Sequence, residues 1–265
     1  MASALTIAGS DSGGGAGIQA DLKTFAALGV YGTSAIAALT AQNTVAVTGI
    51  HEVPAAFVVA QIDAVAEDIA IDAVKTGMLA TAAIVEAVTA AIDELDLPKV
   101  VVDPVLIATS GEPLLDEDGI EVMRAELLPR ALVVTPNIPE AEILSRYQIR
   151  SMEDVQEAAR RIHDLGPTAV IITGGHRAGD VVVDVLYDGD RFLELRTDRV
   201  PDRHVHGTGC ALASAVAAYL AQGVPLEQAA ERAQRYVANA IRHAFPVGQG
   251  QHVLDHFWNR RTLDS

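Results

Sequence analysis

The sequence contains a single cysteine, Cys210, among 265 residues. One cysteine cannot form an intrachain disulfide, so the chain fits a reducing compartment, and we expect it in the cytoplasm. The N-terminal residues carry no basic side chain, and the first charged side chain is Asp11. A secretory signal peptide is therefore not expected.

Positively charged side chains are also scarce. Only three lysines occur, at positions 23, 75 and 99, and the formal net charge is −16. A surface with this charge repels nucleic acid and anionic lipid, so we exclude both as partners. An anionic ligand would have to be held by backbone N–H groups, by arginine or by Mg²⁺.

No Asp, Glu, Lys or Arg occurs between Thr24 and His51. Glycine and polar residues interrupt this segment, so it is not expected to cross a membrane. Buried β-strands explain the missing charge better. The part from Tyr31 to Ile50 is a candidate partial cover for a ligand site.

Strand-like apolar runs alternate with helical patterns along the chain, and half of the residues are hydrophobic. This alternation predicts an α/β fold with a mostly parallel central sheet covered by helices on both faces. Because no long polar linker or internal repeat occurs, residues 1–265 are predicted to form one domain. The predicted strands are 5–8, 71–74, 99–103, 131–134, 169–172 and a hairpin of 181–187 with 191–196; the predicted helices are 18–28, 81–95, 116–128, 209–221, 226–245 and those beginning near 137 and 151.

Ligands of such sheets bind at the carboxyl ends of the strands. Asp103 and Glu140 follow two of the predicted strands, and together they could hold Mg²⁺ directly or through water. Taken alone, however, residues 137–140 are also typical of an ordinary helix start, where proline and an acidic residue are common in the first turn.

A second candidate is the segment His206-Gly207-Thr208-Gly209-Cys210, which opens an Ala-rich helix. Unpaired backbone N–H groups at a helix start bind phosphate, and the same field favours a thiolate at Cys210. The alternative interpretation is a glycine turn followed by a buried cysteine.

Other motifs are excluded. Residues 15–20 match G-x-G-x-x-A, but no acidic residue lies between Asp21 and Glu52, as a dinucleotide site requires. No G-x-x-x-x-G-K-[ST] occurs, which excludes a P-loop. The pairs His204/His206 and His252/His256 lack the further ligands of a zinc site.

Several motifs together resemble the hydroxymethylpyrimidine/phosphomethylpyrimidine kinases, thiamine-biosynthesis enzymes of the ribokinase-like superfamily. The resemblance covers nearly the whole chain and would make the fold a three-layer αβα sandwich. The motifs that carry it are residues 9–25 (GSDSGGGAGIQADLKTF), 41–44 (AQNT), 75–79 (KTGML), 102–105 (VDPV), 110–115 (SGEPLL), 135–140 (TPNIPE), 174–176 (GGH) and 206–210 (HGTGC).

The resemblance implies two successive phosphorylations of 4-amino-5-hydroxymethyl-2-methylpyrimidine by ATP with Mg²⁺, and it suggests a homodimer. The residues it assigns fall into four groups. Gly9, Asp21, Gln42, Met78 and Val105 would hold the pyrimidine; Cys210 would be the base, with Gly207, Thr208 and Gly209 beside it; Thr173, Gly175 and His206 would contact ATP; Asp103 and Glu140 would hold the metal.

The chain departs from this family at Thr173, where lysine is frequent before Gly-Gly-His. ATP would then depend on Mg²⁺, on the helix start and on Lys75 or an arginine. Two alternatives remain open: a pyridoxal kinase of the same superfamily, and a sensor or carrier that binds an aminopyrimidine without turnover.

Overall fold

The computed structural model describes residues 1–107, 113–175, 179–200 and 205–261. Ser110, Gly111, Glu112 and His176, which belong to the motifs quoted above, lie outside these residues, as does His204.

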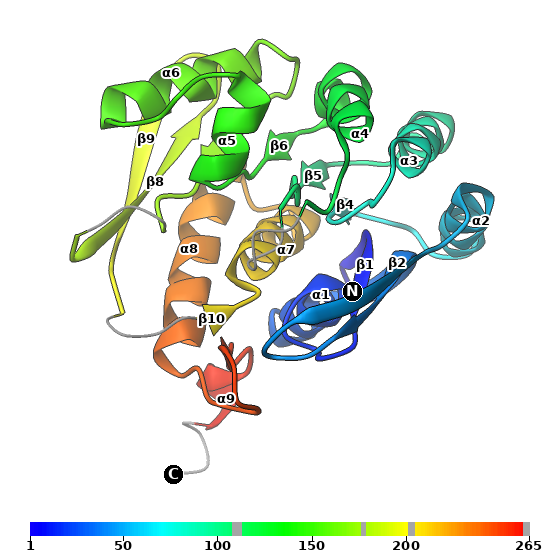
Figure 1. The fold of residues 1–265 in the computed structure, drawn as a ribbon, viewed down its shortest axis with the longest axis horizontal. Coiled ribbons are helices and arrows are strands. Elements are labelled where there is room, and N and C mark those ends of the chain that lie inside the picture. The colour runs from blue at the N-terminus through cyan, green and yellow to red at the C-terminus, as the bar shows by residue number, and fades with distance from the viewer. Residues whose placement is uncertain (108–112, 176–178, 201–204, 262–265) are drawn as a thin grey trace.

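Nine strands of the described chain form one sheet, in the order β3-β2-β1-β4-β5-β6-β7-β8-β9 (Figure 1). Six of them are mutually parallel: β1 (Ser3–Asp11), β2 (Tyr31–Gln42), β4 (Ala73–Thr76), β5 (Val100–Val102), β6 (Val133–Val134) and β7 (Val170–Ile172). β3 (Val47–Glu52) pairs antiparallel with β2, and β8 (Val181–Tyr187) and β9 (Phe192–Asp198) form the predicted hairpin beyond β7. The mostly parallel sheet is confirmed.

Helices cover both faces of this sheet because successive strand residues point to opposite sides. In β5, Val100 and Val102 pack into one apolar core and Val101 into the other. The first core lies under α2 (Ala55–Ala66), α3 (Ala82–Glu94), α4 (Glu117–Val122), α5 (Ile138–Ser145) and α6 (Met152–His163). The second lies under α1 (Gly17–Ala27), α7 (Thr208–Ala221) and α8 (Leu226–Arg242). Figure 1 shows the two helical layers on either side of the sheet, which confirms the three-layer sandwich.

Local capping signals fix several helix ends. Ser151 accepts from the Asp154 amide and Asp154 accepts from the Ser151 amide, so this predicted helix start is confirmed. The predicted 116–128 helix is regular only over α4. A π-helical turn (Met123–Leu127) and a 3₁₀ turn (Leu128–Arg130) follow it, because Pro129 cannot continue the regular hydrogen-bond pattern.

The prediction of buried strands between Thr24 and His51 is wrong in part. β2 is only partly buried and β3 is almost entirely exposed, because β3 is the edge of the sheet with β2 as its single neighbour. The turn between them, residues 43–46, and the first residue of β3 line the cavity described below. A small second sheet joins β10 (Val205–His206) to β11 (His252–Val253), and α9 (Trp258–Arg261) follows.

Candidate active site

A cavity of about 1020 Å³ lies at the carboxyl ends of the parallel strands. Its walls come from the segments that follow β1, β4, β5, β6 and β7, from the β2–β3 turn and from the start of α7. The structure brings together all of the predicted site residues except one. Those that line the cavity are Gly9, Gln42, Met78, Asp103, Val105, Glu140, Thr173, Gly175, His206, Gly207, Thr208, Gly209 and Cys210.

The exception is Asp21, which is a correction to its predicted contact with the pyrimidine. Its side chain is completely buried beneath the cavity. One carboxylate oxygen accepts from Thr6 at 2.6 Å, the other from Ser214 at 2.6 Å, and Lys75 Nζ lies 3.1 Å from both. Asp21 therefore has no lone pair to offer a ligand, and its partner is Lys75.

Lys75 also lines the cavity, although its side chain is fully buried and its ammonium is paired with Asp21. Burial opposes the ammonium charge, but the neighbouring Asp21, Cys210 and Asp103 raise the pKa of Lys75 well above its ordinary value. Nζ lies 3.4 Å from Asp103 Oδ2. The lysine is thus a fixed positive charge in the cavity wall.

The start of α7 presents backbone amides to the cavity. Gly207 precedes the helix with a positive φ of 83°, and a Cβ there would lie 1.9 Å from the Gly15 carbonyl oxygen. Glycine is therefore required at 207. No side chain of the described residues caps this helix, and Thr208, Gly209 and Cys210 all line the cavity. This geometry suits an anionic group.

Cys210 does not carry the lowered pKa that the helix start predicted. Burial, together with Asp103 and Asp21, raises the pKa of its thiol far above the usual range, although Lys75 and the Gly17 amide favour the thiolate. In the ligand-free protein these influences favour the protonated thiol of Cys210, which lies beside Asp103.

Asp103 and Glu140 form an acidic pair at the ends of β5 and β6. Burial and the charge of Asp103 raise the pKa of Glu140 to about 8. Glu140 Oε2 accepts from the Asn137 amide at 2.9 Å, so the helix-start role is also real. Asp103 Oδ2 is buried without a hydrogen-bond partner among the described residues. Lys75 Nζ, 3.4 Å away, is its ion-pair partner, and a carboxylate oxygen without a hydrogen bond beside a second carboxyl group fits a hydrated Mg²⁺.

The part of the cavity around Gln42, called here the Gln42 end, offers a polar edge and an apolar face. Gln42 lies between Thr40 and His206. The Gly9 amide donates to the Met78 carbonyl at 3.0 Å, and a Cβ on Gly9 would lie 3.1 Å from Met78 Sδ, so glycine allows this methionine to pack closely. Val105 follows Asp103 on the wall between the two ends.

His206, which was predicted to contact ATP, lies beside Gln42 in the cavity wall and directly precedes Gly207 at the start of α7. Its Nε2 lies 3.3 Å from Asp11 Oδ2 and 3.0 Å from Gln42 Nε2. Asp11 was not among the predicted site residues. An Asp before three glycines is a turn signal, and here the carboxylate accepts from the amides of Gly13, Gly15 and Ala16.

Thr173 and Gly175 follow β7 at the other end. The Thr173 amide donates to the Pro136 carbonyl at 2.9 Å, and Gly175 accepts at 2.8 Å from Arg199 Nη1. Arg199, which sequence reasoning missed, brings a guanidinium to the cavity wall. No sequence signal marks it, because it follows β9, a hairpin strand far along the chain.

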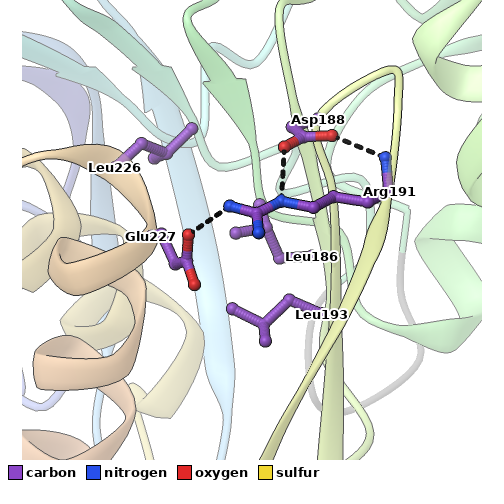
Figure 2. Close-up of a pocket in the computed structure, with 6 residues that line it drawn as sticks. All are labelled: Leu186, Asp188, Arg191, Leu193, Leu226 and Glu227. Atoms are coloured by element: carbon purple, nitrogen blue, oxygen red, sulfur yellow. Dashed lines mark hydrogen bonds and ion pairs between the residues drawn. The ribbon is translucent and has the colours of Figure 1, made fainter.

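A second cavity, of about 70 Å³, lies between the β8–β9 hairpin and the start of α8. Figure 2 shows Arg191 reaching from Asp188 to Glu227 across it. The hairpin turn is at the amino end of β7, far from the strand ends that build the large cavity. These ion pairs tie the hairpin to α8.

Among the described residues, no group of three or more His, Cys, Asp or Glu side chains is arranged to hold a metal ion. No helix of the described chain is long and apolar enough to cross a membrane.

Comparison with known proteins gives consistent results. A family model described as phosphomethylpyrimidine kinase matches residues 11–255. The chain is similar to the hydroxymethylpyrimidine/phosphomethylpyrimidine kinase of Bacillus subtilis, with 46% identity over 264 residues, 99% of this chain and 97% of that protein. It is also similar to the thiamine biosynthesis bifunctional protein ThiED of Geobacter sulfurreducens, with 52% identity over 96% of this chain but only 52% of that longer protein.

Solved structures resemble the fold closely. An ADP complex of Bacillus subtilis pyridoxal kinase superimposes with a TM-score of 0.91 at 38% identity, over 98% of this chain and 99% of that one. A phosphomethylpyrimidine kinase from Clostridium difficile gives a TM-score of 0.81 at 40% identity, over 91% of this chain and 100% of that one.

Proposed function

This chain belongs to the phosphomethylpyrimidine kinase family, and from that premise we propose how its site works. It is a phosphotransferase of thiamine synthesis. It phosphorylates the hydroxymethyl group of 4-amino-5-hydroxymethyl-2-methylpyrimidine and then the resulting monophosphate, and ATP is the phosphoryl donor. The observation that carries the assignment of the site is the continuous cavity that joins Gln42 and Met78 to the start of α7.

The pyrimidine ring occupies the Gln42 end. The Gln42 amide can both donate to and accept from the aminopyrimidine edge, while Met78 and Val105 cover its faces. Gly9 lets Met78 pack closely against the β1 backbone at this end. Asp21 acts from below by fixing Lys75 and does not contact the ring.

The phosphoryl group that is transferred lies against the start of α7. The amides of Thr208, Gly209 and Cys210 stabilise the charge that grows on it. Thr173, Gly175 and Arg199 line the remaining wall, where the nucleotide binds. Asp103 and Glu140 would hold Mg²⁺, which supplies positive charge to the phosphate oxygens.

Cys210 is the base for the first transfer only. Asp103 raises the pKa of its thiol in the ligand-free protein, so compensation of the Asp103 charge in the loaded site favours the thiolate. Lys75 and the Gly17 amide then act in the same direction. The second acceptor is a phosphate monoester that is already mostly ionised, because its second pKa is about 6, and it needs no base.

A coupled ATP-consumption assay with the pyrimidine, its monophosphate and pyridoxal tests this function. Turnover of both pyrimidines is expected, and Cys210→Ser should slow the first transfer far more than the second. Equal losses in both transfers would exclude Cys210 as the base.

Pyridoxal kinase is the second candidate, because a pyridoxal kinase superimposes with a TM-score of 0.91. Preferred turnover of pyridoxal in the same assay would favour it. Binding of the pyrimidine without turnover would instead indicate a sensor or carrier.

We also propose one kinase domain over residues 1–265, supported by the single large sheet that organises the two cores of the described chain. A homodimer is proposed because Leu39, Ile50 and Phe57 expose apolar surface on β2, β3 and α2. Sedimentation analysis would test the dimer. A cytoplasmic location is proposed from the free thiol of Cys210.

A further inference from the structure

The side-chain amide of Gln42 is held at both ends by neighbours in the cavity wall. One end lies 3.1 Å from Thr40 Oγ1 and the other 3.0 Å from His206 Nε2. Thr40 Oγ1 is also 3.0 Å from the Ser10 carbonyl oxygen, and His206 Nε2 is 3.3 Å from Asp11 Oδ2. The amide therefore sits in a chain of polar groups whose donors and acceptors can be counted.

Asp11 fixes the direction of the hydrogen bonds in this chain, because an ionised carboxylate can only accept hydrogen bonds. Although burial opposes the charge, His206 and the Ala16 and Gly13 amides lower the pKa of Asp11, so this side chain is ionised at neutral pH. His206 Nε2 faces Asp11 and must therefore carry a hydrogen. A ring nitrogen that carries a hydrogen cannot also accept one from Gln42.

With Gln42 Nε2 toward His206, two N–H groups would face each other at 3.0 Å. A half-turn of the amide exchanges its nitrogen and oxygen and removes the conflict. His206 Nε2 then donates to both Asp11 and the amide oxygen, Gln42 Nε2 donates to Thr40, and the Thr40 hydroxyl donates to the Ser10 carbonyl. Each contact in the chain then joins a donor to an acceptor.

We propose that His206 is a positioning residue that fixes the Gln42 amide with its oxygen toward His206 and its nitrogen toward Thr40, and that this orientation selects an amino-substituted ring. The inference rests on the proposed function for its substrate. It gives His206 a role that differs from the expected contact with ATP.

The structure holds the His206 ring firmly enough for this role. Its backbone pairs with Val253 of β11, and its Nε2 faces Asp11. A Cβ added to Gly15 would lie 2.8 Å from His206 Cδ2, so the glycine-rich loop packs directly on the ring. The ring cannot turn away from Gln42 without disturbing one of these contacts.

The consequence is a fixed order of donor and acceptor along the cavity wall. A 4-aminopyrimidine presents an amine donor next to a ring-nitrogen acceptor. The 4-oxo analogue, with N–H next to C=O, presents the reverse order. A Gln42 amide that cannot turn matches the first pattern and opposes the second, since a mismatched buried donor or acceptor strongly disfavours binding.

The orientation is tested first without any substrate. In NMR spectra of the purified protein, the Gln42 side-chain amide protons should show nuclear Overhauser contacts to the Thr40 methyl group. Contacts to the His206 ring protons instead would overturn the proposed orientation. This measurement does not depend on the enzyme's activity, so it separates a failure of this inference from a failure of the proposed function.

Selectivity is then tested with His206→Phe, which keeps a ring but removes the N–H. The ratio of kcat/KM for the 4-amino substrate over its 4-oxo analogue should fall at least tenfold, because the amide can now turn. Gly15→Ala, which displaces the ring but keeps the histidine, should lower the same ratio. Thermal melting of each variant checks that it is folded.

The matched control is His243→Phe, at the end of α8, where the ring stacks on Trp258 outside the cavity. It should leave the ratio unchanged. Equal loss of activity on both analogues in His206→Phe would show that the ring only packs, and would overturn the proposed selectivity. If the wild-type protein phosphorylates neither pyrimidine while the NMR contacts are as expected, the proposed function fails and the orientation stands.

Discussion

Replacing Lys75 by methionine should destabilise this protein more than any surface substitution. Lys75 Nζ lies 3.1 Å from both oxygens of Asp21 and 3.4 Å from Asp103, and Lys75 and Asp21 are completely buried. Methionine preserves most of the side-chain volume but removes the only positive charge in contact with these two carboxylates among the described residues. The loss is therefore electrostatic and not a loss of packing.

The magnitude follows from the burial of both partners. Removing one partner of a buried ion pair leaves an uncompensated charge, which typically costs about 3–5 kcal/mol. Removing both partners costs much less, because neutral groups of similar shape need no counter-charge. The double variant Asp21→Asn/Lys75→Met should therefore be less destabilised than Lys75→Met alone, and the asparagine introduced by Asp21→Asn can still accept from Thr6 or Ser214.

Urea unfolding at pH 7 of the wild type, both single variants and the double variant measures this coupling. Lys99→Met is the matched control, because Lys99 Nζ donates to the Leu220 carbonyl at 2.8 Å and contacts no buried carboxylate among the described residues. It should cost about 1 kcal/mol. A cost below about 1 kcal/mol for Lys75→Met, or strict additivity in the double variant, would refute the role of Lys75 as a buried counter-charge.

Three further predictions concern other parts of the molecule. Gly207→Ala should abolish ATP turnover and lower the melting temperature, because its Cβ would meet the Gly15 carbonyl at 1.9 Å; near-normal activity would contradict the close approach of these loops. Burial lowers the pKa of His256 to about 4 from an ordinary 6.5, so the unfolded chain binds a proton first as the pH falls. Between pH 7.5 and 5 this should remove about 2 kcal/mol of stability, measured by urea unfolding, and His256→Asn should lose that part of the pH dependence. Because Glu140 has a pKa of about 8, Mg²⁺ must displace its proton on binding. The Mg²⁺ affinity measured by calorimetry in the presence of ADP should therefore rise from pH 6.5 to 8.5. An affinity that does not change with pH in the wild type would contradict direct binding of Mg²⁺ by Glu140. Glu140→Gln should bind Mg²⁺ more weakly without that rise.

Local signals in the sequence were enough to predict most of the fold. Ser151 with Asp154 and the turn at residues 188–190 depend on neighbours within a few positions, and both predictions are confirmed. The helix α2 was not predicted, because its residues 55–66 are apolar on nearly all sides and its start, at Pro54, has no capping side chain. The exposure of β3 could not be predicted either, since it depends on the strand being at the edge of the sheet.

The site was predicted less completely, because its electrostatics depend on residues far apart in the chain. The sequence patterns predicted that Asp103, Glu140 and Cys210 lie at the carboxyl ends of the strands, and the structure places them in one cavity. The burial of Asp21, however, depends on Lys75 and Ser214, which are 54 and 193 positions away. No local pattern indicates that these side chains meet, so Asp21 was taken for a ligand-binding acceptor.

The pKa of Cys210 is raised, although the helix start predicted a lowered value, and the sizes of the helix-start and burial effects explain why. A helix start stabilises a negative group by typically 0.3–1 kcal/mol, and by about 2 kcal/mol in favourable cases. Full burial can shift a pKa by about 3–5 units, and each unit corresponds to about 1.4 kcal/mol. Only the first effect could be predicted from the sequence, whereas the end of β5 places Asp103 next to the partly buried thiol and adds to the second. Burial and the neighbouring carboxylates therefore outweigh the helix start in the ligand-free protein, and the proposed role of Cys210 as a base requires that ligand binding compensate the Asp103 charge.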